Sequence, residues 1–286
     1  MAKPLSRWFY YGRLRFLGRI AYNLTIAAEL AWHRLTDFGK SSSTDSLDDV
    51  TAVIKTFERP LILKRLIRSI RRFYPQLKIV VADDSRKPAT IPGIETVILT
   101  FDSGVSAGRN AALKVVRTKY VLMLDDDFVF FRNTVLAPAL ELMERYPEVD
   151  ILGGKVINLP FYTSTDYREA ELFPTHAEPL RTPGSRIGAA EVMEKVANFY
   201  IGRTVSICQI GWDEQLKRLD HADFFTRARG KLLTAYYPQL QVLHAQNLFD
   251  DKYQRFREND IPDKNLLYRR YYQNLKRSNH NGLLNQ

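Results

Sequence analysis

The sequence has very little cysteine and no long apolar run. Its single cysteine, Cys208, excludes an intramolecular disulfide and is compatible with a reducing compartment. The longest mostly apolar stretch near the start, residues 20–32, is interrupted by Asn23, Thr25 and Glu29, and it is shorter than the roughly 20 residues that span a bilayer. We therefore expect no transmembrane anchor and no signal peptide. The expected location is cytoplasmic, with at most peripheral contact at the inner membrane face.

Negative charge is also scarce. Lys and Arg number 42 against 32 Asp and Glu, which gives a formal net charge of +10. This balance favours an anionic partner, such as a nucleotide diphosphate, a lipid headgroup surface or a nucleic acid. The glycine-rich phosphate loops of other nucleotide-binding proteins are missing, because residues 104–110 match neither the dinucleotide nor the Walker spacing.

The N-terminal part differs in composition from the rest of the chain. Residues 1–43 mix basic, aromatic and aliphatic side chains and end in a Gly-Lys-Ser-Ser-Ser linker, which predicts a basic amphipathic helical extension. Residues 1–39 would either contact a membrane surface peripherally or pack on the main domain, and the sequence favours neither. Residues 44–286 are expected to form the main domain, with a basic C-terminal tail at 251–286.

Residues beyond 50 alternate short β-rich runs with helical periodicity. This pattern predicts βαβ units and therefore an α/β fold, with a mostly parallel sheet and helices on both faces. Residues 160–187 carry Pro, Gly, Thr and Ser without a clear period, which indicates a loop. The expected strands are 50–56, 77–82, 96–100, 120–124, 150–157 and 232–243, and the expected helices are 60–73, 106–117, 135–146 and 222–229.

Three carboxylates, Asp125, Asp126 and Asp127, end the apolar strand at 120–124. Carboxylates at the carboxyl end of a parallel strand face the crevice where α/β proteins bind ligands. Adjacent acids repel one another, and a hard divalent cation such as Mn²⁺ or Mg²⁺, which also binds phosphate oxygens, would neutralise them. The run therefore predicts a metal site. The alternative is a solvated acidic turn.

Two further segments could bind parts of a nucleotide. Asp83 and Asp84 end the strand at 77–82, and their carboxylates could accept hydrogen bonds from a base or a ribose, although Asp also forms turns. In residues 104–110, glycines permit a close backbone approach, and a helix start together with Arg109 favours phosphate.

The order of these motifs resembles the nucleotide-binding half of GT-A glycosyltransferases, especially family 2. The residues that carry a narrower resemblance, to animal β-1,4-N-acetylgalactosaminyltransferases of the GM2 synthase type, are Lys55-Thr56-Phe57, 67–75, Ala82 to Ser85, 104–110 and Asp125 to Phe128. The resemblance implies a GT-A, Rossmann-like fold with a nucleotide-binding half at 50–131 and an acceptor half at 132–250. It further implies that Thr56, Asp83 and Asp84 flank the uridine with Arg109 nearby. Asp127 would bind the metal, and Asp125 or Asp126 would touch ribose or metal.

A second motif, downstream, concerns the acceptor. Residues 211–214 followed by 220–225 are similar to the acceptor-side motif of these enzymes. Family 2 members usually have Glu-Asp where this chain has Asp220-His221, and the second acid is their general base. An inverting transfer needs a carboxylate or imidazole near the acceptor hydroxyl. Asp220, His221 and Asp223 all qualify by type, and we favour Asp220 with His221 as the rival.

His244 follows an extended run, and its imidazole could complete an oxygen-rich site and favour manganese over magnesium. A histidine after a strand can equally be structural.

The resemblance implies an inverting, metal-dependent glycosyltransferase. Its donor would be a UDP-sugar, with UDP-GalNAc, UDP-GlcNAc and UDP-Gal as candidates, and its acceptor a hydroxyl of a glycan or glycolipid. One alternative is a nucleotidyltransferase or phosphotransferase with the same metal site. Another is a non-enzymatic, basic protein that binds nucleic acid or a membrane. On the preferred hypothesis no nucleic-acid partner is expected.

Overall fold

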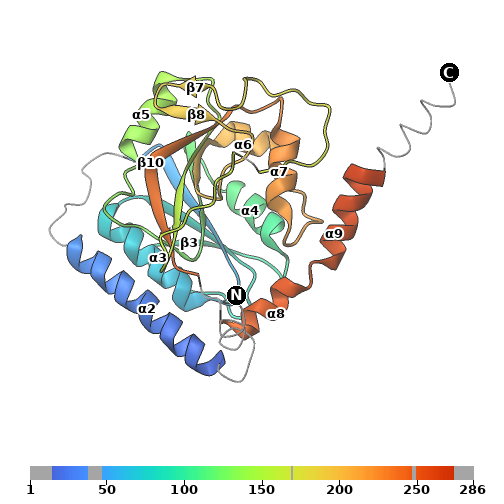
Figure 1. The fold of residues 1–286 in the computed structure, drawn as a ribbon. Coiled ribbons are helices and arrows are strands. Elements are labelled where there is room, and N and C mark those ends of the chain that lie inside the picture. Colours follow the sequence, from blue (N-terminus) through green and yellow to red (C-terminus); the bar gives the residue numbers. More distant parts are fainter. Residues whose placement is uncertain (1–14, 38–46, 169, 247–248, 274–286) are drawn as a thin grey trace, which may run out of the picture.

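The computed structural model describes residues 15–37, 47–168, 170–246 and 249–273. One mixed sheet of ten strands runs through it in the order β3-β2-β1-β4-β9-β6-β10-β8-β7, and β5 pairs with β10 off this path (Figure 1). The linker expected at 39–43 lies outside the described residues, as do residues 1–14 and 274–286. The strands are β1 (Val50–Thr56), β2 (Lys78–Asp83), β3 (Glu95–Ile98), β4 (Tyr120–Asp125), β5 (Phe128–Val129), β6 (Ile151–Asn158), β7 (Arg186–Ile187), β8 (Ala190–Val192), β9 (Tyr200–Arg203) and β10 (Thr234–His244).

The sheet is parallel where the sequence predicts it. Strands β3, β2, β1 and β4 are parallel neighbours, and β6 is parallel to β10. Their carboxyl ends meet at one edge of the sheet, so that Thr56 lies beside Asp83 and Lys55 beside Asp125. This register gathers the polar residues that follow each apolar run.

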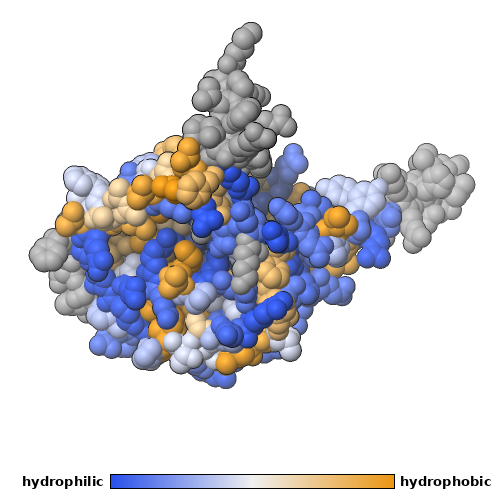
Figure 2. All heavy atoms as spheres, turned by 90° about the horizontal axis from the view of Figure 1, so that it is seen from below, coloured by the Kyte–Doolittle hydropathy of each residue, from blue (hydrophilic) through white to orange (hydrophobic). Residues whose placement is uncertain are grey.

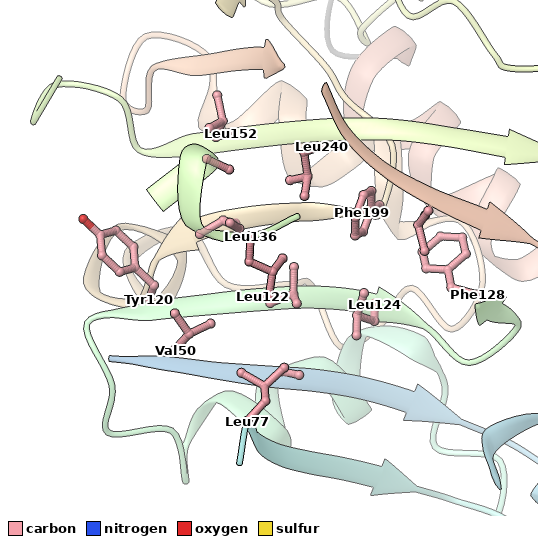
Figure 3. Close-up of a cluster of buried hydrophobic side chains, with 14 of the residues drawn as sticks. Val50, Leu77, Tyr120, Leu122, Leu124, Phe128, Leu136, Leu152, Phe199 and Leu240 are labelled. Atoms are coloured by element: carbon pink, nitrogen blue, oxygen red, sulfur yellow. The ribbon is translucent and has the colours of Figure 1, made fainter. Parts of the chain in front are cut away.

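Helices cover both faces of the sheet. On one face, α3 (Pro60–Phe73) and α5 (Ala137–Arg145) pack with one set of strand side chains into the main core, part of which Figure 3 shows. On the other face lie α4 (Val105–Leu113), α6 (Thr204–Ile210) and α7 (Asp220–Ala228). Both faces are covered because strand side chains alternate between them. In β1, Ala52 and Ile54 point into the main core and Val53 into the core on the other face.

Helix α3 illustrates how the sequence determines a local structure. Pro60 lies in the first turn, where its missing N–H leaves no hydrogen bond unmade. Apolar residues at helical spacing, among them Leu63, Leu66 and Ile70, are fully buried against the sheet.

Helix α2 (Arg15–Thr36) lies alongside α3 on the outside of the molecule (Figure 1). Its residues Tyr22 and Ile26 are buried in a third, smaller apolar cluster with Phe131, Leu243 and Phe249. None of the helices within the described ranges is long and apolar enough to cross a membrane.

Helices α8 (Asp251–Glu258) and α9 (Ile261–Tyr268), followed by a short π-helix at Arg269–Gln273, form the described part of the basic tail.

Several elements were not expected from the sequence, namely the short strands β5, β7 and β8, helix α6 and strand β9. Strand β9 matters most for the sheet, because it lies between β4 and β6 and is antiparallel to both. It has only four residues, and the period of so short a run carries no clear signal. The helix expected at 106–117 ends at Leu113, after which Val115 and Val116 turn back towards the sheet.

Candidate active site

The acidic run lies at the carboxyl end of β4 and is compensated by cationic side chains. Arg59 pairs with both Asp126 and Asp127, and its Nη1 lies 3.2 Å from Oδ2 of Asp127. The hydroxyl of Thr56 donates to Oδ2 of Asp126 at 2.7 Å. The repulsion expected among three adjacent acids is therefore offset by the protein itself, with Arg59 the main compensating charge for Asp126.

The two buried acids of the run differ in proton affinity. Burial raises the pKa of Asp126 to about 6, although the charge of Arg59 opposes the shift. Burial would also raise the pKa of Asp127, but its hydrogen bond with His244 and the charge of Arg59 outweigh burial and lower it. Asp127 is therefore the carboxylate of this pair that stays ionised across the neutral range.

His244, at the end of β10, faces Asp127. Its Nε2 lies 3.2 Å from Oδ1 of Asp127, and its Nδ1 lies 2.8 Å from Oδ1 of Asn158. An amide oxygen only accepts, so Nδ1 carries a proton. Nε2 donates to Asp127 when it also carries one, and without that proton its lone pair is available to a cation.

This arrangement fits a divalent cation. A metal-binding histidine usually donates its other ring N–H to a neighbouring acceptor, and Asn158 supplies that acceptor for His244. Together, Asp127 and His244 offer one oxygen and one nitrogen, a donor set that suits Mn²⁺. No group of three or more His, Cys, Asp or Glu side chains in the described part of the chain gathers as a metal site. The remaining ligands would have to be phosphate oxygens or water.

Arg109 joins the acidic run to the downstream motif. Its guanidinium is buried, with Nη1 2.6 Å from Oδ2 of Asp220 and Nη2 3.0 Å from Oδ1 of Asp125. Burial raises the pKa of Asp220, although the charge of Arg109 opposes this. Asp125 remains the most accessible acid of the run, with 39% of its side chain exposed.

Asp83 and Asp84 have different surroundings despite being adjacent. Asp83 accepts hydrogen bonds from the backbone N–H groups of Ser85 and Ala89 at 2.9 and 2.8 Å. It is not among the described residues that line a cavity at the carboxyl edge of the sheet. Asp84 lines the cavity, pairs with Lys55 and accepts from the backbone N–H of Gly104 at 2.9 Å.

Most of these side chains line one cavity of about 280 Å³ at the carboxyl edge of the sheet. It brings together Thr56, Asp84, Arg109, the whole acidic run, Asp220, His221 and His244. The lining carries both signs of charge, and a diphosphate bound with a divalent cation would suit it. The cationic residues are Lys55, Arg59, Arg109, Lys217 and Arg218, and the acidic ones are Asp84, Asp102, Asp125, Asp126, Asp127 and Asp220.

A second cavity, of about 450 Å³, adjoins the first. The loop after β6 and the strand β6 itself line much of its wall, together with Tyr167 and Tyr236. Residues that line both cavities form a shared wall, and they are Asp125, Asn198, His221, His244 and Gln246.

His221 lies in this shared wall at the start of α7. Its Nε2 lies 2.7 Å from the carbonyl oxygen of Val196, and the rings of Tyr167 and Phe225 pack edge-on against it. Burial lowers the pKa of His221 to about 3, so the ring is neutral at physiological pH. A carbonyl only accepts, so Nε2 carries the proton and the lone pair is on Nδ1.

Asp223 is separated from the other two candidate bases. Its side chain is fully buried, and it accepts from Arg227 at 2.8 Å and from Arg270 and Tyr271 at 2.7 Å each. It is not among the described residues that line either cavity. These contacts tie α7 to the C-terminal helical segment.

Sequence reasoning missed several residues of the site. Arg59 lies two residues after the Lys-Thr-Phe run, but a lone arginine there belongs to no recognisable motif. Asn198 and Gln246 lie outside any motif. Tyr253 stacks its ring on the Arg59 guanidinium at 3.9 Å, and that contact arises only because α8 returns to the cavity.

Comparisons with known proteins agree with this geometry. The family model described as glycosyl transferase family 2 matches residues 51–199. Human β-1,4 N-acetylgalactosaminyltransferase 1 is 36% identical over 215 residues, covering 70% of this chain and 39% of that protein. Mouse β-1,4 N-acetylgalactosaminyltransferase 2 is 33% identical over 203 residues, covering 68% of this chain and 39% of that protein. This chain thus matches well under half of the length of these relatives.

The crystal structure of S. aureus TarS shares the fold, with a TM-score of 0.50 at 20% identity over 66% of this chain and 36% of that one. The GT-A fold expected from the sequence, and the resemblance to the GM2 synthase type, are confirmed by these matches. The family model covers β1 to β4 and the acidic run that lines the cavity. Together with the identity to the human and mouse relatives, this match shows that the chain belongs to glycosyl transferase family 2.

Proposed function

We propose that this protein transfers a sugar from a UDP-sugar to a hydroxyl group of a glycan or glycolipid. The observation that carries the proposal is the wall shared by two cavities, in which Asp125, His221 and His244 face both. The first cavity, lined by both cations and carboxylates, suits a nucleotide diphosphate bound together with a divalent cation. The second would receive the acceptor, so that the two substrates meet at this wall.

In the first cavity, Asp84 and Thr56 are placed to contact the uridine, while Arg109 and Lys217 suit the diphosphate. A divalent cation, Mn²⁺ in preference to Mg²⁺, would be held by Asp127 and His244, with Asp125 close by. When bound, it would supply positive charge to the diphosphate leaving group. The names of the relatives favour UDP-GalNAc over UDP-GlcNAc and UDP-Gal as the donor.

We further propose that His221 is the general base, with the negative charge of the bound donor raising the pKa that burial lowers. It lines both cavities, whereas Asp220 lines only the first and Asp223 neither. The acceptor hydroxyl would give its proton to Nδ1 of His221 while its oxygen bonds to the anomeric carbon and the bond from that carbon to UDP breaks. Single displacement from the opposite face inverts the anomeric configuration. Asp220, paired with Arg109, would instead hold that guanidinium and Asp125 in position.

The test measures transfer and UDP binding separately. With a panel of nucleotide sugars and Mn²⁺, the wild type should release UDP most rapidly from its true donor. His221→Ala should lower kcat by about 10²- to 10⁴-fold, the usual contribution of a general base, with the Kd for UDP unchanged. The matched control is His176→Ala, an exposed histidine on the loop before β7. Full activity in His221→Ala would remove His221 from the mechanism, and absence of any UDP binding would remove the proposed donor site.

A further inference from the structure

Helix α2 has apolar residues on two opposite sides. Successive residues of an α-helix are turned by about 100°, so Leu17, Ile20, Leu24 and Leu35 fall on one side of α2. Tyr22 and Ile26 fall on the other side and are buried against the body of the protein. The first group is exposed, with 65% of Leu24 and 71% of Leu35 accessible.

We call this exposed side the α2 stripe. It consists of apolar side chains, with Phe16 and Trp32 at its edges, and Figure 2 shows apolar surface gathered over α2. Its members are Phe16, Leu17, Ile20, Leu24, Trp32 and Leu35.

The charges that border the α2 stripe are positive. Arg34 is exposed along the same edge of the stripe as Phe16, and Nη2 of the neighbouring Arg72 on α3 donates to the carbonyl oxygen of Arg34 at 2.9 Å. The exposed Arg19 falls on the side of Ile26 and does not border the stripe. The one acid of the helix, Glu29, is held by the hydroxyl of Tyr162.

This charge pattern decides between two occupants of the stripe. A second copy of the chain with its α2 parallel to this one would bring Arg34 and Arg72 of one protomer against the same arginines of the other, and like charges would repel. A membrane surface with anionic lipids offers acyl chains to the stripe and negative charge to its cationic border. Trp32, at one edge of the stripe, is a residue type enriched at the headgroup level.

We propose that the α2 stripe binds the surface of a membrane that contains anionic lipids, with α2 parallel to that surface. Because Tyr22 on the opposite side of α2 lines the second cavity, bound lipid would lie about one helix diameter, roughly 10 Å, from that cavity. The binding itself does not depend on the proposed transfer reaction, and it is measured without any sugar donor.

The experiment is co-sedimentation of the full chain with phosphatidylcholine vesicles and with vesicles that also contain phosphatidylglycerol. We expect binding to the anionic vesicles that weakens as salt increases. Leu24→Glu with Leu35→Glu should weaken binding by tenfold or more, and Arg34→Glu with Arg72→Glu by about fivefold per arginine. The matched control is Val205→Glu with Leu180→Glu, at exposed apolar positions on other elements.

Three results would overturn the proposal. The first is that Leu24→Glu with Leu35→Glu binds anionic vesicles as the wild type does. The second is a dimer in sedimentation velocity that these substitutions dissociate, with no vesicle binding by the wild type, which would assign the stripe to a second copy. The third is that the Tm of the Leu24→Glu, Leu35→Glu variant falls by more than that of the Val205→Glu, Leu180→Glu control while vesicle binding is unchanged. That result would assign the stripe to another segment of this chain.

Discussion

Nη1 of Arg109 lies 2.6 Å from Oδ2 of Asp220, although 111 residues separate them in the sequence. The same guanidinium holds Asp125, so that one buried cation joins the acidic run to the start of α7. Breaking a buried ion pair leaves its partner uncompensated in a medium of low polarity. Several consequences for stability, binding and pH dependence can be measured.

Asp220→Ala should lower the free energy of unfolding by about 3–5 kcal/mol, because it leaves the buried Arg109 with one carboxylate fewer. The measurement is urea unfolding at neutral pH. Glu148→Ala is the control, because it removes an exposed pair with Arg181 that is worth about 0–1 kcal/mol. Equal effects of the two substitutions would show that the buried pair has no special weight in the fold.

Gly108→Ala should disturb the site through Lys55. A Cβ at position 108 would lie 2.2 Å from Cδ of Lys55, whose amine pairs with Asp84. The overpacking should cost about 1–3 kcal/mol of unfolding free energy, and UDP binding should weaken because Asp84 lines the cavity. In a Lys55→Ala background the same glycine substitution should cost almost nothing. A cost independent of Lys55 would mean that the helix itself, and not this contact, is affected.

Metal affinity should depend on Asn158 as well as on the two expected ligands. In the presence of UDP, Asn158→Ala should weaken Mn²⁺ binding by about 10- to 100-fold, because it releases the proton-bearing side of the His244 ring. His244→Ala and Asp127→Asn should weaken it further. Calorimetric titration of Mn²⁺ into the UDP complex measures this, with His176→Ala as the control. Wild-type affinity in Asn158→Ala would contradict the orientation argued for His244.

Acidification should destabilise the fold through His221. Its pKa is lowered from 6.5 to about 3 by burial, so the unfolded chain binds a proton that the folded protein does not. The stability contributed by the neutral ring is present above pH 6.5 and is lost as the pH falls towards 3. Between pH 7 and pH 5 this loss amounts to about 2 kcal/mol. In urea unfolding curves, His221→Gln should remove that part of the pH dependence. If the unfolding free energy of the variant depends on pH as in the wild type, His221 does not cause the loss.

Much of the parallel half of the sheet could be predicted, because its signals are local. The run at 50–56 is β1 residue for residue, and the helix expected at 60–73 is α3. Apolar periodicity decides such elements within a few residues of chain. The acidic run could be located at a strand end for the same reason, since the apolar strand stops where Asp125 begins.

The partners of these acids could not be predicted in the same way. Arg59 was overlooked, although it pairs with both Asp126 and Asp127. The sequence offered three candidate bases in four residues and ranked Asp220 first. The helical turn between them directs Asp223 into a buried cluster and leaves only His221 in the wall of both cavities.

The sequence by itself therefore determined the α/β elements, the position of the acids at strand ends and the family to which they point, because each depends on neighbouring residues or on a short motif. Tertiary structure alone decided which charges meet. Arg109 reaches Asp220 and His244 reaches Asp127 across more than a hundred residues of chain, and Tyr253 covers Arg59 only after α8 returns to the cavity. Such contacts depend on the order of the strands in the sheet, and a local sequence pattern does not determine that order.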